Sequence, residues 1–245
     1  MEMGDGRRRR GSITASELFE QLERDEGYQR YLRDQERWRK KAREEFRRDA
    51  AGLMAELNAL GYMFDSLDEL QRPCDYRTAI PVLIRWLPLL SNDRVKLSVS
   101  RALTTPWARP QAARVLIDEF KRAPQRGSGD ITWTIGNALS VVADDSVYQE
   151  IVDLALNSDH GRARGMLPLS FVHMKKHRSA AIDVALRLLS DDDVAVASVR
   201  FLKRVNATGA TDALAPLLNH PSGIIRSEAQ KALAKFGELA QKKSL

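Results

Sequence analysis

His173 and His177 lie four residues apart, a spacing at which two imidazoles on one helix face can bind the same metal ion. The run Asp191–Asp193 supplies carboxylates of the kind that bind hard cations. No further Cys or paired carboxylate accompanies the histidines, and a turn with a helix cap explains the aspartates more simply. The sequence contains no nucleophile elbow, phosphate loop or HExxH motif. We therefore predict a protein that is not an enzyme and that has no metal or cofactor.

The charge of the chain is basic and unevenly distributed. The 245 residues carry a formal net charge of +6. Residues 76–245 contribute 24 Lys/Arg against 16 Asp/Glu, whereas residues 1–75 contribute 15 against 17. A basic region can attract nucleic acid or an acidic protein, and Arg7–Arg10 could contact phosphates, although a solvated tail is the simpler interpretation.

Three observations bear on the location of the protein. A single cysteine, Cys74, cannot form an internal disulfide. No apolar run has the length needed to cross a bilayer, and Met1–Gly11 lacks the apolar core of a signal peptide. We expect a cytoplasmic protein without membrane contact.

The first 75 residues are predicted to form a basic, disordered tail over 1–13 and a helical region over 14–75. Thr14 and Glu17 match a capping box, and Gly27 is expected to interrupt the helix that follows. Apolar residues at steps of three, four or seven then predict one long helix from Tyr28 to Leu60, ended by Gly61. Its apolar stripe favours a cap on the rest of the protein, with pairing to a partner or to itself as the alternative.

Residues 76–245 are predicted to consist of repeated helical pairs. The stretch Ala79–Leu103 reads as two amphipathic helices joined by a polar turn, and Ala213–Leu233 is a shifted copy of it. Aligned second helices begin at Val95, Ile131, Ala163, Val194 and Ile225, at spacings of 36, 32, 31 and 31 residues. Such a period indicates stacked helical pairs that share one continuous core.

The same alignment sorts the faces of the second helices. We number each second helix from its first residue, which is position 0. Positions 8 and 11 are mostly apolar and are predicted to be buried. Position 8 is occupied by Leu103, Leu139, Phe171, Leu202 and Leu233, and position 11 by Pro106, Val142, Met174, Val205 and Phe236. Position 1 contains Lys96, Arg164 and Arg226, which we expect to pair with carboxylates in neighbouring turns, such as Asp93, Asp130 or Asp193.

Pro81 and Pro216 inside first helices, the Asp-rich turns, and the hydrophobic–basic steps Val95-Lys96 and Ile225-Arg226 resemble the HEAT-repeat family and, in general layout, bacterial HEAT-repeat proteins. The resemblance covers about residues 76–237. It implies an all-α fold, a right-handed α-solenoid of about five HEAT-like hairpins, here with an N-terminal long helical cap. It also implies that the second helices line a concave surface, and that the protein is a scaffold or adaptor.

Positions 2, 6 and 9 lie opposite the core and are predicted to face outward. They supply a basic and polar strip with one large aromatic residue: Arg101, Trp133, Asn137, Arg200, Lys203 and Lys231. Such a strip suits acidic side chains or phosphates, and an Arg or Trp within it suits a binding hot spot. An ordinary solvated face, with Trp133 packed between repeats, is the alternative.

Three functions are compatible with these features. The first is a non-catalytic scaffold that binds a protein partner through the concave strip. The second is nucleic-acid binding in a basic groove, with a DNA-glycosylase-like enzyme as an extension that finds little support in the placement of the tryptophans. The third, a lyase or chaperone-like role toward a cofactor-bearing protein, has no residue that selects it. The sequence does not determine the oligomeric state.

Overall fold

The computed structural model describes residues 13–71, 74–123 and 129–243, in which helices are joined by turns and irregular segments and no strand is present. The predicted all-α class is therefore confirmed for this part of the chain. The tail residues up to 12, including Arg7–Arg10, lie outside the described residues. The chain divides into two compact units, unit 1 over Met1–Arg48 and unit 2 over Asp49–Leu245, so the division falls inside a long helix.

Unit 1 contains the short helix α1 (Ala15–Arg24) and the first part of α2 (Glu26–Ala59). The predicted capping box is present: the Glu17 amide donates to Thr14 Oγ1 at 3.2 Å, and the Thr14 amide donates to Glu17 Oε2 at 2.8 Å. The break between the two helices lies at Asp25 rather than at Gly27. Asp25 Oδ1 accepts from the Tyr28 amide at 2.8 Å, and this contact caps the first turn of α2.

The long helix α2 ends in unit 2, where its last turns are buried. Ala50, Leu53 and Leu57 are at most 2% exposed. Gly61 adopts a left-handed φ of +91°, and the Tyr62 amide donates to the Leu57 carbonyl at 3.1 Å, so the predicted glycine stop is confirmed.

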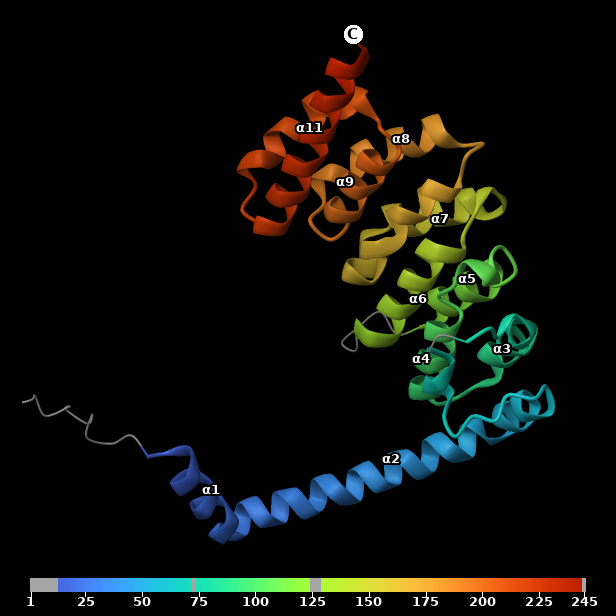
Figure 1. Cartoon of the computed structure of the whole chain (residues 1–245), viewed down its shortest axis with the longest axis vertical. Helices are drawn as coiled ribbons and strands as arrows, with labels where there is room; N and C mark the ends of the chain where they lie inside the picture. The colour runs from blue at the N-terminus through green and yellow to red at the C-terminus, as the bar shows by residue number, and fades with distance from the viewer. Residues whose placement is uncertain (1–12, 72–73, 124–128, 244–245) are drawn as a thin grey trace, which may run out of the picture. The chain divides into compact units, whose positions relative to one another are not determined.

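Unit 2 contains pairs of consecutive helices (Figure 1). The first members are α3 (Ile80–Trp86) with η3 (Leu87–Leu89), α5 (Ala113–Arg122), α7 (Tyr148–Leu156), α8 (Arg178–Arg187), and α10 (Thr211–Leu214) with η9 (Ala215–Asn219). The second members are α4 (Asp93–Ala102), α6 (Gly129–Val142), the 3-10 segment η6 (Ser158–His173), α9 (Ala195–Arg204) and α11 (Gly223–Lys243). The segment η6 is kinked at Gly161, whose φ of +48° is not helical.

The second helices form a row. α4 packs against α6, α6 against η6, η6 against α9, and α9 against α11, while each also contacts the first member of its own pair. The short 3-10 helix η1 (Leu67–Gln71) packs on the free side of α4. Every second helix between the ends therefore has two like neighbours, which lets a short helix bury most of its apolar surface.

The predicted core positions are largely correct. At position 8, Leu103, Leu139, Phe171 and Leu202 are all 0% exposed, whereas Leu233 is half-buried. Position 11 is less uniform, because Pro106 is exposed and Val205 is half-buried. The reason is that α4 ends at Ala102 and α9 at Arg204, before the helix can carry position 11 back to the core.

Gly136 permits the closest approach in the row. A Cβ atom built on Gly136 would lie 2.5 Å from the Ala163 carbonyl oxygen, a distance that no real side chain tolerates. The absence of a side chain therefore lets α6 lie directly against η6.

Candidate binding surface

The six residues predicted for binding lie on four second helices, namely α4, α6, α9 and α11. We call them the second-helix strip: Arg101, Trp133, Asn137, Arg200, Lys203 and Lys231. Trp133 is 45% exposed, Arg101 and Lys231 are exposed, and the other three are half-buried. All six therefore reach solvent, and Trp133 is not enclosed between neighbouring helices.

Three members of the strip converge on one carboxylate that the sequence analysis did not single out. Glu228, on α11, is only 7% exposed. Its Oε1 lies 3.4 Å from an Arg200 guanidinium nitrogen and 3.2 Å from Lys231 Nζ, and its Oε2 lies 3.0 Å from Lys203 Nζ. The Glu228–Lys231 spacing of three residues was the only signal in the sequence. The two contacts from α9 depend on how the helices pack.

This group has a well-defined charge. Burial alone would raise the pKa of Glu228, but hydrogen bonds from Lys203, Arg200 and Lys231 outweigh it and lower the pKa from 4.5 to about 2. Glu228 is thus ionised near neutral pH. One carboxylate faces three cations, so the group keeps an excess of positive charge toward solvent.

Replacing Glu228 by glutamine should lower the free energy of unfolding at pH 7 by about 1–3 kcal/mol, because three cations lose the negative charge and one of the two acceptor oxygens that they share. Because the pKa of Glu228 is lower in the folded than in the unfolded state, its contribution to the free energy of unfolding is complete above about pH 4.5. This contribution is lost as the pH falls toward 2. The difference in free energy of unfolding between wild type and Glu228→Gln, measured by urea titration, should therefore become smaller as the pH is lowered from 4.5 to 2. A difference that is constant with pH would contradict the assignment.

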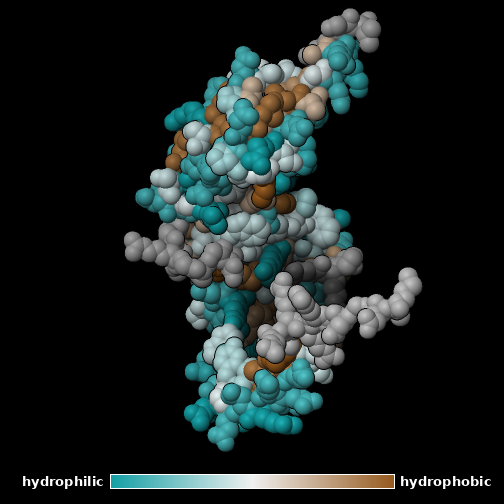
Figure 2. Space-filling model, turned by 90° about the vertical axis from the view of Figure 1, so that its left-hand side faces the viewer, coloured by the Kyte–Doolittle hydropathy of each residue, from teal (hydrophilic) through white to brown (hydrophobic). Residues whose placement is uncertain are grey.

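The rest of the strip is different in character. Arg101, Trp133 and Asn137 lie on α4 and α6, whereas the group around Glu228 belongs to α9 and α11. Between them lies η6, which presents Leu169 and Val172, both half-buried, at the same helical positions. Figure 2 views the side on which α6, α9 and α11 lie in Figure 1, and it shows hydrophobic residues interspersed with hydrophilic ones. The surface is therefore mixed rather than uniformly basic.

Several other polar side chains of unit 2, three of them cations, have structural partners. The carbonyls near the ends of successive second helices accept hydrogen bonds from side chains of other segments, a favourable arrangement at the negative end of a helix. The Tyr76 hydroxyl donates to the Ala102 carbonyl at 2.9 Å, and the Arg109 guanidinium donates to the Val141 carbonyl at 3.0 Å. Arg178 donates to the carbonyls of Phe171 at 3.4 Å and Val172 at 3.1 Å, and Lys235 donates to the Lys203 carbonyl at 3.1 Å.

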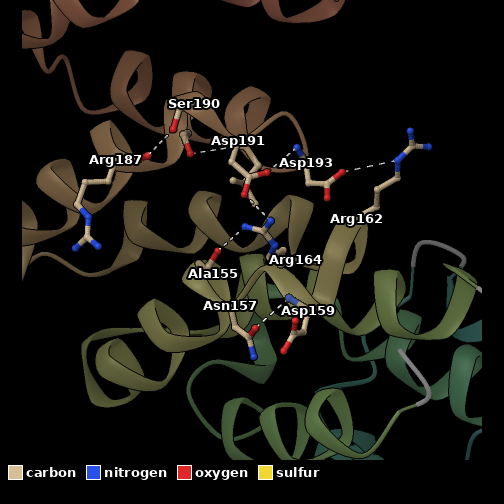
Figure 3. Close-up of polar contacts among 11 residues, drawn as sticks. Ala155, Asn157, Asp159, Arg162, Arg164, Arg187, Ser190, Asp191 and Asp193 are labelled. Atoms are coloured by element: carbon tan, nitrogen blue, oxygen red, sulfur yellow. Dashed lines mark hydrogen bonds and ion pairs between the residues drawn. The ribbon is translucent and has the colours of Figure 1, made fainter. Parts of the chain in front are cut away.

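The predicted pairing of position 1 with turn carboxylates is correct for only one residue. Arg164, 2% exposed, donates to Asp191 Oδ2 at 2.5 Å and to the Ala155 carbonyl at 2.9 Å (Figure 3). Lys96 instead binds Glu119 on α5 at 2.6 Å, and Arg226 donates to the His220 and Pro221 carbonyls at 2.6 and 2.8 Å. Lys96 thus meets a carboxylate of the first helix of the next pair, and Arg226 meets the backbone rather than a carboxylate of the turn before its own helix.

The two histidines do not share a ligand site. His177 stacks on the Tyr148 ring with the centroids 4.2 Å apart. His173 is half-buried; burial, reinforced by Arg109 and other nearby cations, lowers its pKa to about 4, so the ring is neutral at pH 7. Within the described ranges, no group of three or more His, Cys, Asp or Glu is arranged to hold a metal ion.

The aspartate run serves the turn before α9. Asp191 Oδ1 accepts from the Asp193 amide at 3.1 Å, Asp192 lies 3.0 Å from His220, and Asp193 lies 3.8 Å from Arg162. These contacts agree with the turn interpretation made from the sequence.

Of the helices in the described part of the chain, none is both long and apolar enough to cross a membrane. Comparisons with protein-family models, with curated proteins and with solved structures gave no match to this chain.

Proposed function

We propose that unit 2 is a right-handed, HEAT-like α-solenoid that acts as a non-catalytic scaffold, and that the second-helix strip binds an acidic segment of a partner protein. The observation that carries this proposal is the exposure of Trp133, 45%, on α6, which packs against the helix that presents the half-buried Leu169 and Val172. Exposed tryptophans and arginines contribute most often to binding hot spots. The cations around Glu228, at one end of the strip, would favour a partner that carries carboxylates.

Nucleic acid is the weaker candidate on the same surface. Arg200, Lys203 and Lys231 are confined to one end of the strip and Glu228 neutralises one of their three charges, so they do not form the continuous track of cations that a phosphate backbone requires. The apolar centre offers no phosphate contacts. If nucleic acid did bind here, its affinity would fall steeply with salt concentration, because binding releases the counterions condensed on the phosphate backbone.

The test compares two doubly substituted chains. The strip variant carries Arg101→Glu and Trp133→Ala, and the control variant carries Lys121→Glu and Arg187→Glu, both exposed on first helices. Proteins are crosslinked to each chain in a lysate of the source cells, identified by mass spectrometry, and then titrated in purified form. We expect a partner whose affinity falls about 30-fold for the strip variant, equivalent to about 2 kcal/mol, and stays unchanged for the control.

Two results would overturn the scaffold proposal. One is a partner that binds both variants equally, which would place the interface elsewhere. The other is tight binding of a duplex or single-stranded oligonucleotide that weakens steeply with salt in the wild type and is lost in the strip variant.

A further inference from the structure

One apolar stripe runs along most of α2. Its residues follow one another at steps of three or four, which keeps them on a single face of the helix. They are Tyr28, Tyr31, Gln35, Trp38, Ala42, Phe46, Ala50, Leu53 and Leu57. Helix α2 is continuous over all of them, from Glu26 to Ala59 (Figure 1).

The burial of this stripe changes along the helix. Its last three residues are 2%, 0% and 0% exposed within unit 2. Tyr31 and Trp38 are each 56% exposed, and Leu32 at the edge of the stripe is 40% exposed. The same stripe that is buried at one end of the helix is therefore exposed at Tyr31 and Trp38 and only half-buried at the other stripe positions between 28 and 46. In proteins, most of the stability of a helix comes from the packing of its apolar face against another element.

We propose that residues 28–46 of α2 pair antiparallel with the same segment of a second copy of this chain. In that arrangement the bulky and the small or polar residues alternate across the seam. Trp38 faces Gln35 of the second copy, and Tyr31 faces Ala42 of the second copy. A parallel pair would instead set Trp38 against Trp38 and Ala42 against Ala42, which fills the seam unevenly.

Charge complementarity favours the antiparallel pair. Asp34 and Lys41 are seven residues apart and therefore flank the stripe on the same side. Antiparallel pairing brings Asp34 beside Lys41 of the second copy, and the two-fold axis repeats this contact. Within one chain, Asp34 binds Arg37 and Lys41 lies 3.9 Å from Glu45, but all four side chains are well exposed. Exposed pairs of this kind contribute little and can exchange partners.

The experiment measures the mass of the full chain by sedimentation equilibrium. We expect wild type at twice the 27.6 kDa chain mass. Asp34→Lys and Lys41→Asp should each weaken association at least about tenfold, because each creates two like-charge contacts. An equimolar mixture of the two variants, and the double variant Asp34→Lys/Lys41→Asp, should restore it. Lys40→Asp is the matched control, since residue 40 lies on the far side of the helix from the stripe, and it should leave association unchanged.

A wild-type chain that is monomeric at on the order of 0.1 mM would overturn the proposal, because an interface of micromolar affinity is filled at that concentration. Loss of association in both single variants without rescue in the mixture would also overturn it. Residues 26–48 contain nine Lys/Arg and five Asp/Glu, so vesicles of phosphatidylserine and phosphatidylcholine are tested in parallel. Binding of a monomer to those vesicles would replace the second copy with a lipid surface. None of these outcomes depends on the second-helix strip.

Discussion

Replacing Arg164 by methionine is expected to lower the free energy of unfolding by about 3–5 kcal/mol, the usual cost of removing one partner of a buried ion pair. Methionine keeps the length of the side chain but none of its donors. The Asp191 carboxylate, 33% exposed, and the Ala155 carbonyl would then lose their hydrogen bonds in the packed region between α7, η6 and the turn before α9 (Figure 3). A carboxylate left without its cation pays its desolvation without compensation.

Arg162 provides the matched control. It is the same residue type two positions earlier on η6, and it also approaches an aspartate of that turn, Asp193, at 3.8 Å. Its side chain is 95% exposed, whereas that of Arg164 is 2% exposed. Arg162→Met should therefore change the free energy of unfolding by no more than about 0.5 kcal/mol. Urea unfolding followed by tryptophan fluorescence measures the free energy of unfolding of both variants. Equal losses of stability in Arg164→Met and Arg162→Met would contradict the prediction that burial of the arginine determines the cost.

Replacing Phe171 by alanine should cost a comparable amount, about 3–5 kcal/mol. Phe171 is 0% exposed, and its ring packs edge-to-face on Phe201 of α9 at 5.6 Å and near Tyr148 of α7 at 6.2 Å. It therefore joins three helices, η6, α7 and α9, at one point. Truncation leaves a cavity at this junction, and helices held by contacts on several sides cannot collapse to fill it.

Two further variants make the Phe171 measurement diagnostic. Phe171→Leu keeps most of the volume and should lose less than half as much stability, because the cavity is smaller. Val172→Ala, at the neighbouring half-buried position, should lose about 1 kcal/mol or less. The same urea titration is used for all three. A Phe171→Ala protein as stable as Val172→Ala would show that the junction does not support the row of second helices.

Local features of the sequence were predicted well. The capping box at Thr14 and Glu17 and the left-handed stop at Gly61 each depend on neighbouring residues along the chain, and both are present. The buried face of the second helices followed from the 3.6-residue period, as Leu103, Leu139 and Leu202 show. The error in the predicted burial at position 11 arose because the sequence does not mark where α4 and α9 end.

The candidate surface was only partly predictable. The outward face of each second helix follows from the helical period, so Trp133, Arg200 and Lys231 were placed on an accessible side without knowledge of the packing. Glu228 was missed because its environment is made by residues of another helix. In isolation its position on α11 is that of an ordinary surface glutamate.

Short-range patterns in the sequence were sufficient to predict the helical class and the inner and outer faces of the second helices, since both depend on contacts within a few turns of chain. Which charged side chains meet one another depends instead on how the helices pack. The lateral offset between neighbouring helices places Glu228 among Arg200, Lys203 and Lys231, and Arg164 against Asp191. That offset is set by side-chain packing between helices, which no short-range pattern encodes.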